Sequence, residues 1–139
     1  MPLVHPSTHP LVAHKLAALR DVATPPAAFR RLVRDLAALV AAEATADLPT
    51  RDLDVATPMG TARCRVLADD VAIVPILRAA GIPRLKMIAL IAAPEGIAAF
   101  AAELPDVPIH VGVIDARLND VGYIDPGLGD AGDRQFNTF

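Results

Sequence analysis

The sequence predicts an α/β fold, in which helices pack on a sheet that is at least partly parallel. Three observations predict it: helical periodicity near the start, a period-two pattern after it, and short continuous apolar runs further on. The chain has 139 residues, of which 53% are hydrophobic and 21% charged, so it is long enough and apolar enough to bury one core. We therefore expect a single domain.

The segment 8–48 is expected to hold two N-terminal helices. Thr8 is the expected N-cap of the first helix, which ends near Arg20. Thr24 is expected to cap the second helix, and Pro49 to end it. Apolar residues recur there at spacings of three and four, as on one face of a helix: Phe29, Leu32, Val33, Leu36, Leu39 and Val40.

The segment 51–67 alternates apolar with charged residues and predicts a β-hairpin. Pro58-Met59-Gly60 is the expected turn. One face should be apolar, with Cys64 on it as a small packed residue, and the other should bring aspartates opposite arginines.

The segment 71–114 is expected to form the core strands and one helix. Val71–Leu77 and Lys86–Ala92 are continuous apolar runs, typical of strands that are buried on both faces. Ile109–Ile114 is a third expected strand, and Pro94–Leu104 a short helix.

One connection conflicts with a simple parallel sheet. Only the eight residues Arg78–Leu85 separate the first two apolar runs, whereas a parallel crossover needs about a dozen residues or more. These two strands are therefore antiparallel neighbours, or not adjacent, or joined in an unusual way.

Composition excludes several classes of protein. The net charge is −3 with no basic run, which argues against nucleic-acid binding, and no apolar run approaches the length of a membrane span. The single Cys64 cannot form an intrachain disulfide, and the four histidines lack a metal-binding spacing. The first residues do not resemble a signal peptide. We expect a soluble, cytoplasmic protein that binds no metal through its own side chains.

Six segments together resemble the uracil phosphoribosyltransferases, a family of type I phosphoribosyltransferases, in order along the chain. They are His9–Lys15, Glu43–Leu48, Val74–Ala79, Ala92–Ile97, Ile114–Asp115 with Leu118–Asn119, and Gly122–Arg134. The resemblance implies a Rossmann-like sheet. It also implies the reaction of uracil with 5-phosphoribosyl diphosphate (PRPP) to give UMP and diphosphate, in pyrimidine salvage.

The resemblance breaks in the centre of the chain. In the family, the strand ending Pro-Ile-Leu-Arg-Ala is followed by a helix, a flexible arm and an Asp-Pro-Met-Leu-Ala-Thr-Gly-Gly-Ser loop that cradles the 5′-phosphate of PRPP. Here Arg78-Ala79 runs directly into 80–84, which resembles the end of the helix after that loop, and none of the eight glycines is adjacent to another. We therefore expect a truncated sheet without the PRPP-binding loop, and impaired or absent activity.

The resemblance also assigns site residues. Ile124, Gly129 and Ala131 would contact uracil through their backbones, together with Asp130. Arg78 and Asp130 would contact PRPP, although PRPP binding itself is in question without its loop. The segment 122–134 is thus the expected uracil loop, and no catalytic residue is assigned.

By resemblance, Mg²⁺ would arrive with PRPP, GTP is a possible activator, and the protein would form a homo-oligomer. An alternative function stays open, in which the chain is a non-catalytic oligomerisation or regulatory partner of an intact phosphoribosyltransferase. A third reading is that the deletion leaves no function.

Four further side chains carry expectations. Asp115, which follows a strand, should orient the neighbouring loop through backbone bonds, and Glu43 should be partly buried beside a partner such as an arginine. Asp125 replaces a residue that is usually apolar in the family, so it needs solvent or a partner. Asn137 replaces a glycine that is usual there.

Overall fold

The computed structural model describes residues 3–68 and 85–138, which belong to two compact units. The first unit comprises Met1–Ala44 and Arg84–Phe139, and the second comprises Thr45–Pro83.

Part of the predicted core lies outside the described residues. This concerns the expected strand Val71–Leu77, the PRPP-contact candidate Arg78 and most of the short connection that follows it. The prediction that this strand is antiparallel or nonadjacent to the next therefore stays a prediction.

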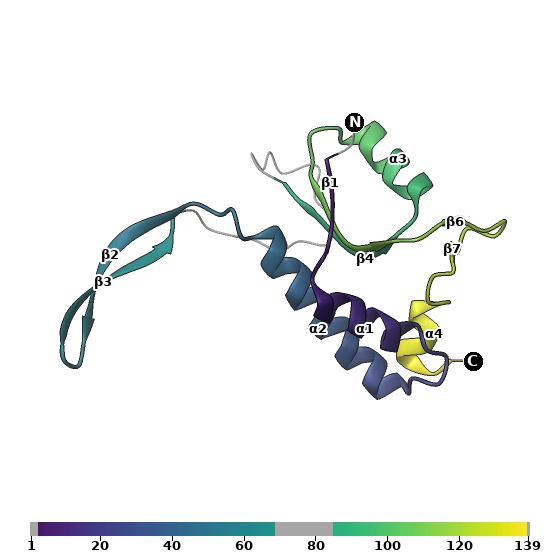
Figure 1. Ribbon diagram of the computed structural model, residues 1–139, viewed down its shortest axis with the longest axis horizontal. Helices are drawn as coiled ribbons and strands as arrows, with labels where there is room; N and C mark the ends of the chain where they lie inside the picture. The colour runs from purple at the N-terminus through teal and green to yellow at the C-terminus, as the bar shows by residue number, and fades with distance from the viewer. Residues whose placement is uncertain (1–2, 69–84, 139) are drawn as a thin grey trace. The chain divides into compact units, whose positions relative to one another are not determined.

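The first unit is built on a parallel sheet with the strand order β1-β5-β4. Its strands are β1 (Val4–Pro6), β5 (Ile109–Ile114) and β4 (Met87–Ala92), and both neighbouring pairs are parallel. The helix α3 (Pro94–Glu103) connects β4 to β5 across one face of the sheet (Figure 1). The predicted α/β class is confirmed.

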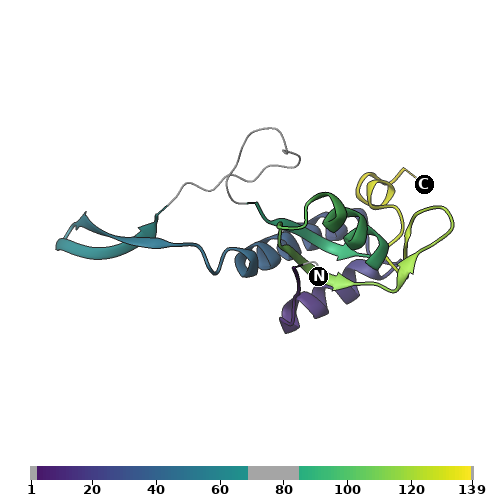
Figure 2. The ribbon, with the colours of Figure 1, turned by 90° about the horizontal axis from the view of Figure 1, so that it is seen from above.

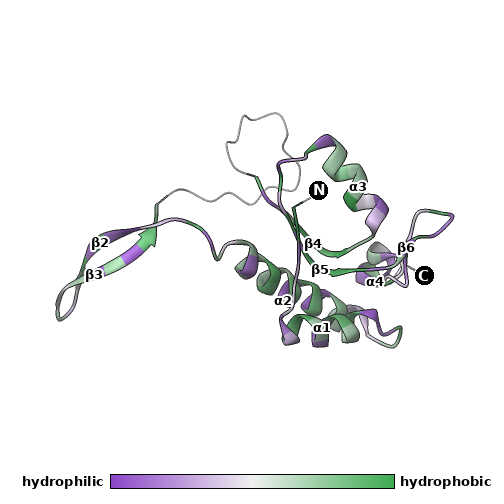
Figure 3. Ribbon diagram, turned by 45° about the horizontal axis from the view of Figure 1, so that its top comes forward, coloured by the Kyte–Doolittle hydropathy of each residue, from purple (hydrophilic) through white to green (hydrophobic). Residues whose placement is uncertain are grey.

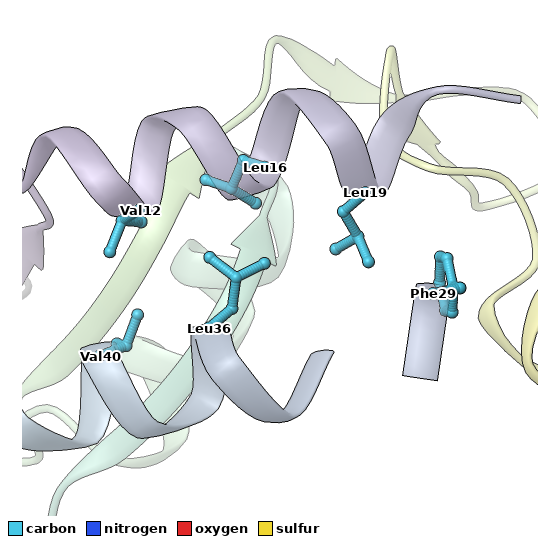
Figure 4. Close-up of a cluster of buried hydrophobic side chains, with 6 residues drawn as sticks. All are labelled: Val12, Leu16, Leu19, Phe29, Leu36 and Val40. Carbon is cyan, nitrogen blue, oxygen red and sulfur yellow. The ribbon is translucent and has the colours of Figure 1, made fainter. Parts of the chain in front are cut away.

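Two helices cover the other face of this sheet (Figure 1). They are α1 (Pro10–Arg20) and α2 (Pro26–Ala44), and their apolar faces meet in the main core cluster (Figure 4). Its fully packed members are Val12, Leu16, Leu19, Phe29, Leu36 and Val40. Burying each large apolar side chain contributes about 1.5–3 kcal/mol, so this cluster holds the two helices together along their length.

The strand β1 was not predicted from the sequence. Three residues carry no readable periodicity, and the strand exists only because β5 pairs with it. The amide of Ser7 donates to the Val111 carbonyl at 2.7 Å, and the amide of Ile109 donates to the Leu3 carbonyl at 2.7 Å. Pro6 fits because β1 is an edge strand of the described sheet, where a missing N–H is tolerated.

Both predicted helix caps were wrong. His9, not Thr8, caps α1, because its Nδ1 accepts from the Leu11 amide at 3.1 Å. The Thr24 hydroxyl donates to the Ala18 carbonyl at 2.6 Å instead of capping α2. The second helix starts at Pro26, so its N-cap position is Pro25, whose side chain cannot accept a hydrogen bond.

The strand β4 is less buried than predicted. Met87 and Ile88 are exposed, whereas the sequence indicated burial on both faces. The reason is topological, because β4 is the last strand of the sheet within residues 3–68 and 85–138.

The second unit contains the predicted hairpin (Figure 2). Strands β2 (Thr50–Thr57) and β3 (Gly60–Leu67) pair antiparallel across a turn at Pro58-Met59. Hydrophobic and hydrophilic residues alternate along β3 (Figure 3), and Cys64 is half-buried.

The expected charge pairing in this hairpin is confirmed. A salt bridge joins Arg63 Nη2 to Asp52 Oδ2 at 2.8 Å. Both side chains are exposed, so this pair contributes about 0–1 kcal/mol.

Candidate functional site

The candidate site is the loop that follows β5 at the carboxyl end of the parallel sheet. It contains the short strands β6 (Arg117–Leu118) and β7 (Ile124–Asp125), which pair antiparallel, and ends in the helix α4 (Ala131–Phe136). Ligands of α/β proteins usually bind at this edge of the sheet.

Asp115 holds the base of the loop. Its side chain is only 4% exposed, and its Oδ2 accepts from the Gly127 amide at 2.9 Å. Its Oδ1 accepts from Arg20 Nη2 at the end of α1. The prediction that Asp115 orients this loop through a backbone bond is confirmed, whereas the sequence did not point to Arg20.

Gly127 is required for the tight turn of the loop. Its φ is +54°, and a Cβ at this position would lie 2.1 Å from the Ile124 carbonyl oxygen. The peptide bond between Asp125 and Pro126 in the same turn is cis. Only a residue without a side chain fits here without moving Ile124.

Replacing Gly127 with alanine should therefore lower the free energy of unfolding by about 1–3 kcal/mol, from backbone strain at positive φ and the contact with Ile124. Gly96→Ala is the matched control, because nothing lies within 4 Å of its added Cβ and alanine is the better helix former. Urea unfolding of both variants checks this, and equal midpoints would contradict it.

Asp125, which was expected to need solvent or a partner, is paired with Arg117. Arg117 donates to Asp125 Oδ2 from both Nε and Nη2, each at 3.1 Å, across the β6–β7 pair. The tip between these strands is closed by Asn119, whose side-chain oxygen accepts from the amides of Val121 and Tyr123.

Asp130 caps the helix α4. Its Oδ1 accepts from the amides of Gly132 at 2.7 Å and Asp133 at 3.0 Å, and its Oδ2 accepts from the Tyr123 hydroxyl at 3.1 Å. The hydrogen bond from the Asp133 amide, followed by those from Tyr123 and Gly132, holds the pKa of Asp130 below its usual 3.8. The same bond to Asp130 raises the pKa of Tyr123.

The lowered pKa of Asp130 makes the start of α4 sensitive to acid. The cap contributes its full stabilisation above the ordinary value of 3.8 and loses it as the pH falls through the lower folded pKa. In Tyr123→Phe the pKa of Asp130 should rise, while the amides of Gly132 and Asp133 still keep it below 3.8. An NMR titration of the Asp130 carboxyl carbon measures this, and an unchanged midpoint in Tyr123→Phe would refute the role of the hydroxyl.

Arg134 ties the loop to the N-terminal helices, and sequence reasoning missed this role. It is 9% exposed and donates to the carbonyls of Leu19 at 2.7 Å, Asp21 at 2.6 Å and Leu128 at 3.0 Å. Its guanidinium also lies 4.5 Å from the centre of the Phe29 ring. The short helix α4 has no apolar face that could have signalled this burial, because Arg134 is its buried residue.

Two smaller expectations also have outcomes. Glu43 is half-buried as predicted, and its partner within residues 3–68 and 85–138 is the Ser7 hydroxyl, at 2.7 Å, where an arginine was the expected example. Asn137 adopts a left-handed conformation with φ 59° at the end of α4, a position that suits glycine and tolerates asparagine.

The structure brings four of the predicted site residues together in one loop. Gly129 has φ +76° and open space where a side chain would project, and Asp130 and Ala131 follow it directly at the start of α4. Ile124 lines an apolar cavity of about 270 Å³ between β4 and α3, seven residues before Ala131. Arg78 lies outside the described residues.

The described residues do not fit a protein-held magnesium ion. No group of three or more His, Cys, Asp or Glu side chains comes together within residues 3–68 and 85–138. Asp130 already accepts three hydrogen bonds. None of the helices in this part of the chain has both the length and the apolar composition of a membrane span.

A parallel sheet with a glycine-containing loop beyond its carboxyl edge defines an α/β protein, a class in which ligands usually bind at that edge. The sequence model of the family described as uracil phosphoribosyltransferase matches residues 6–83 and 79–138. The chain therefore belongs to the uracil phosphoribosyltransferase family.

Two curated relatives illustrate the relationship. The chain is 34% identical over 200 residues to a uracil phosphoribosyltransferase of Dictyoglomus turgidum, covering 94% of this chain and 97% of the relative. It is 36% identical over 201 residues to that of a Roseiflexus species, covering 95% and 97%. Because 200 aligned positions exceed the 139 residues present, this chain lacks a residue at 61 or more of them.

The shortening is thus confirmed, and the two family matches meet at 79–83, where the sequence indicated the junction. The fold also resembles that of the AQ2163 protein from Aquifex aeolicus, with a TM-score of 0.86 and 22% identity over 98% of this chain and 99% of that one.

Proposed function

We propose that this chain keeps the uracil-binding half of a uracil phosphoribosyltransferase site and makes UMP at a far lower rate than an intact relative, if at all. The supporting observation is that the loop 122–134 is held by groups in the retained parts of the chain. Arg20 and Asp115 hold its base, and Arg134 ties its end to α1. None of these supports depends on the missing central segment.

The chemistry of the loop suits a uracil ring. Uracil presents alternating donors and acceptors along one edge, which backbone amides and carbonyls can match. Gly129 leaves open space for a flat ring, and no residue in the described part of the chain accepts from the Ala131 amide. The backbone near Ile124, Gly129 and Ala131 therefore offers contacts without needing charged side chains.

The deficit lies on the PRPP side. The family binds the 5′-phosphate through the amides of a Gly-Gly loop, and this sequence has no adjacent glycines. If each charge-assisted hydrogen bond contributes about 1.5–3 kcal/mol, losing three or more weakens binding by roughly three powers of ten or more. PRPP, and the Mg²⁺ that would accompany it, should consequently bind weakly.

Separate calorimetric titrations with uracil and with PRPP plus Mg²⁺ test the proposal. We expect measurable uracil binding, little or no PRPP binding, and no UMP at ordinary turnover. UMP formation at the rate of an intact relative would overturn the impairment, and absence of uracil binding would overturn the retained half-site.

A matched pair of variants at Ala131 tests whether its amide contributes to uracil binding. Ala131→Pro removes one amide at the first position of α4, where proline is tolerated, and the preceding Asp130 already has an extended backbone with φ −76° and ψ 115°. Uracil affinity should fall about ten-fold while the fold is kept. Ala131→Ser, which retains the amide, should bind like the parent.

The hairpin favours a second candidate function, association with another phosphoribosyltransferase chain. Leu53 and Leu67 are exposed on a two-stranded ribbon, and an isolated hairpin is marginally stable in water. A partner chain that covers it would remove that apolar surface from water.

Native mass spectrometry, alone and mixed with an intact relative, tests this second function. Leu53→Lys should abolish the complex, whereas Asp54→Asn, on the opposite face of the ribbon, should not. A strictly monomeric parent that never mixes would end the idea.

A further inference from the structure

We propose that Arg20 and Asp115 are positioning residues for uracil recognition. Their ion pair joins the end of α1 to the end of β5, and it acts on the loop through the amide of Gly127. This inference rests on the proposed uracil-binding function and deepens it, because it assigns the discrimination among bases to residues that need not touch the base.

The geometry forms a short chain of contacts. Arg20 Nη2 donates to one carboxylate oxygen of Asp115, and the other oxygen accepts from the Gly127 amide at 2.9 Å. A buried carboxylate that holds both partners is oriented by both. Losing either contact leaves Asp115 free to turn and releases Gly127.

Gly127 transmits this orientation to the proposed base contacts. Its Cα lies directly against the Ile124 carbonyl, since a Cβ added there would be 2.1 Å from that oxygen. Gly129 is two residues further along the same turn. A shift of Gly127 therefore moves the backbone of Ile124 and of Gly129 together, and with them the pattern of donors and acceptors.

The ion pair is poorly suited to a purely stabilising role. Arg20 Nε is buried with no acceptor in the part of the chain that the structure describes, and a buried donor without an acceptor is destabilising. Asp115 is buried but the Arg20 side chain is 29% exposed, so the desolvation cost falls mainly on Asp115. Orientation of the Gly127 amide, rather than stability, is the role that this geometry supports.

The end of α1 is also fixed from the opposite side. Arg134 donates to the carbonyls of Leu19 and Asp21, the two neighbours of Arg20 in the chain. Arg134, at the end of the loop, thus holds the backbone on both sides of Arg20, and the Arg20 side chain in turn holds Asp115 at the base of the same loop.

Two double variants separate positioning from stability, because they differ only in whether an oxygen remains for the Gly127 amide. Arg20→Met with Asp115→Leu removes the ion pair and the acceptor. Arg20→Met with Asp115→Asn removes the ion pair and keeps an acceptor. Asp35→Asn is the control carboxylate, since Asp35 pairs with Lys15 at 2.6 Å and makes no hydrogen bond to the loop 122–134.

Uracil titrations should show that the leucine double variant binds about 10- to 100-fold more weakly and discriminates less between uracil and cytosine, as expected for one lost charge-assisted hydrogen bond. The asparagine double variant should bind uracil about three-fold more weakly than the parent, because an acceptor remains but Arg20 no longer orients it. Equal affinities for the two double variants would overturn the inference, whatever their melting temperatures.

Amide hydrogen exchange at Gly127, measured without uracil, provides a readout that does not depend on ligand binding. Protection should fall most in the leucine double variant, less in the variants with Asp115→Asn, and not at all in Asp35→Asn. If the parent binds no uracil, the proposed function fails, and the exchange result alone decides whether Asp115 positions the loop. If the leucine variant does not fold, Asp115→Asn is compared with Asp35→Asn instead. Unchanged Gly127 exchange together with unchanged uracil discrimination in Asp115→Asn would overturn the inference.

Discussion

Restoring the missing central segment should raise the rate of UMP formation by at least about 1,000-fold, because the phosphate loop would return three or more charge-assisted hydrogen bonds to PRPP. The segment is taken from the Dictyoglomus turgidum relative and inserted at 79–83, where the two family matches meet. A steady-state UMP assay on parent and chimera measures the change. We expect the chimera to gain activity because the loop 122–134 is already held by contacts outside the missing segment, from Arg20, Asp115 and Arg134.

The matched control is the same chimera with the two adjacent glycines of the inserted loop changed to valine. It restores chain length and the strand and helix content, but not the amides that would approach the phosphate. Its activity should stay near that of the parent chain. If the valine chimera were as active as the glycine chimera, the phosphate-loop explanation would fail.

Replacing Arg134 with methionine should lower the free energy of unfolding by about 3–5 kcal/mol, because three carbonyls would lose a charged donor in a buried place. These carbonyls belong to Leu19, Asp21 and Leu128, so the loss acts on α1 and on the loop together. The contact with the Phe29 ring would be lost as well. Thermal unfolding should show a melting temperature lower by about 10–20 °C.

Two comparisons make this prediction specific. Arg31→Met removes an exposed arginine of α2 and should change stability by no more than about 0.5 kcal/mol. Arg134→Lys keeps the charge but not the planar guanidinium that reaches several carbonyls. Its melting temperature should therefore lie between those of the parent and Arg134→Met. Equal melting temperatures for Arg134→Met and Arg31→Met would show that Arg134 does not anchor the loop.

Local periodicity was enough to predict most of the regular elements. The apolar spacing of α2, the alternation in the β2–β3 hairpin and the apolar run of β5 each report neighbours within the same element. The loop 122–134 was recognisable from its own residue pattern, and Asp115 from its place after a strand. These features depend on residues that are close in sequence.

Contacts between distant residues could not be predicted in this way. Asp115 meets a residue 95 positions away, Arg20, and Arg134 reaches the Leu19 carbonyl 115 positions away. The strand β1 exists because β5 pairs with it. Glu43 of α2 accepts a hydrogen bond from Ser7, which follows β1 and lies 36 positions away in the sequence.

By itself, the sequence determined the family, the α/β class, the shortened centre and the place of the loop 122–134, because each is encoded in short runs of residues. Only the tertiary structure decided what supports that loop. An arginine on a helix and a carboxylate after a strand become an ion pair only when packing of α1 against the sheet brings them together.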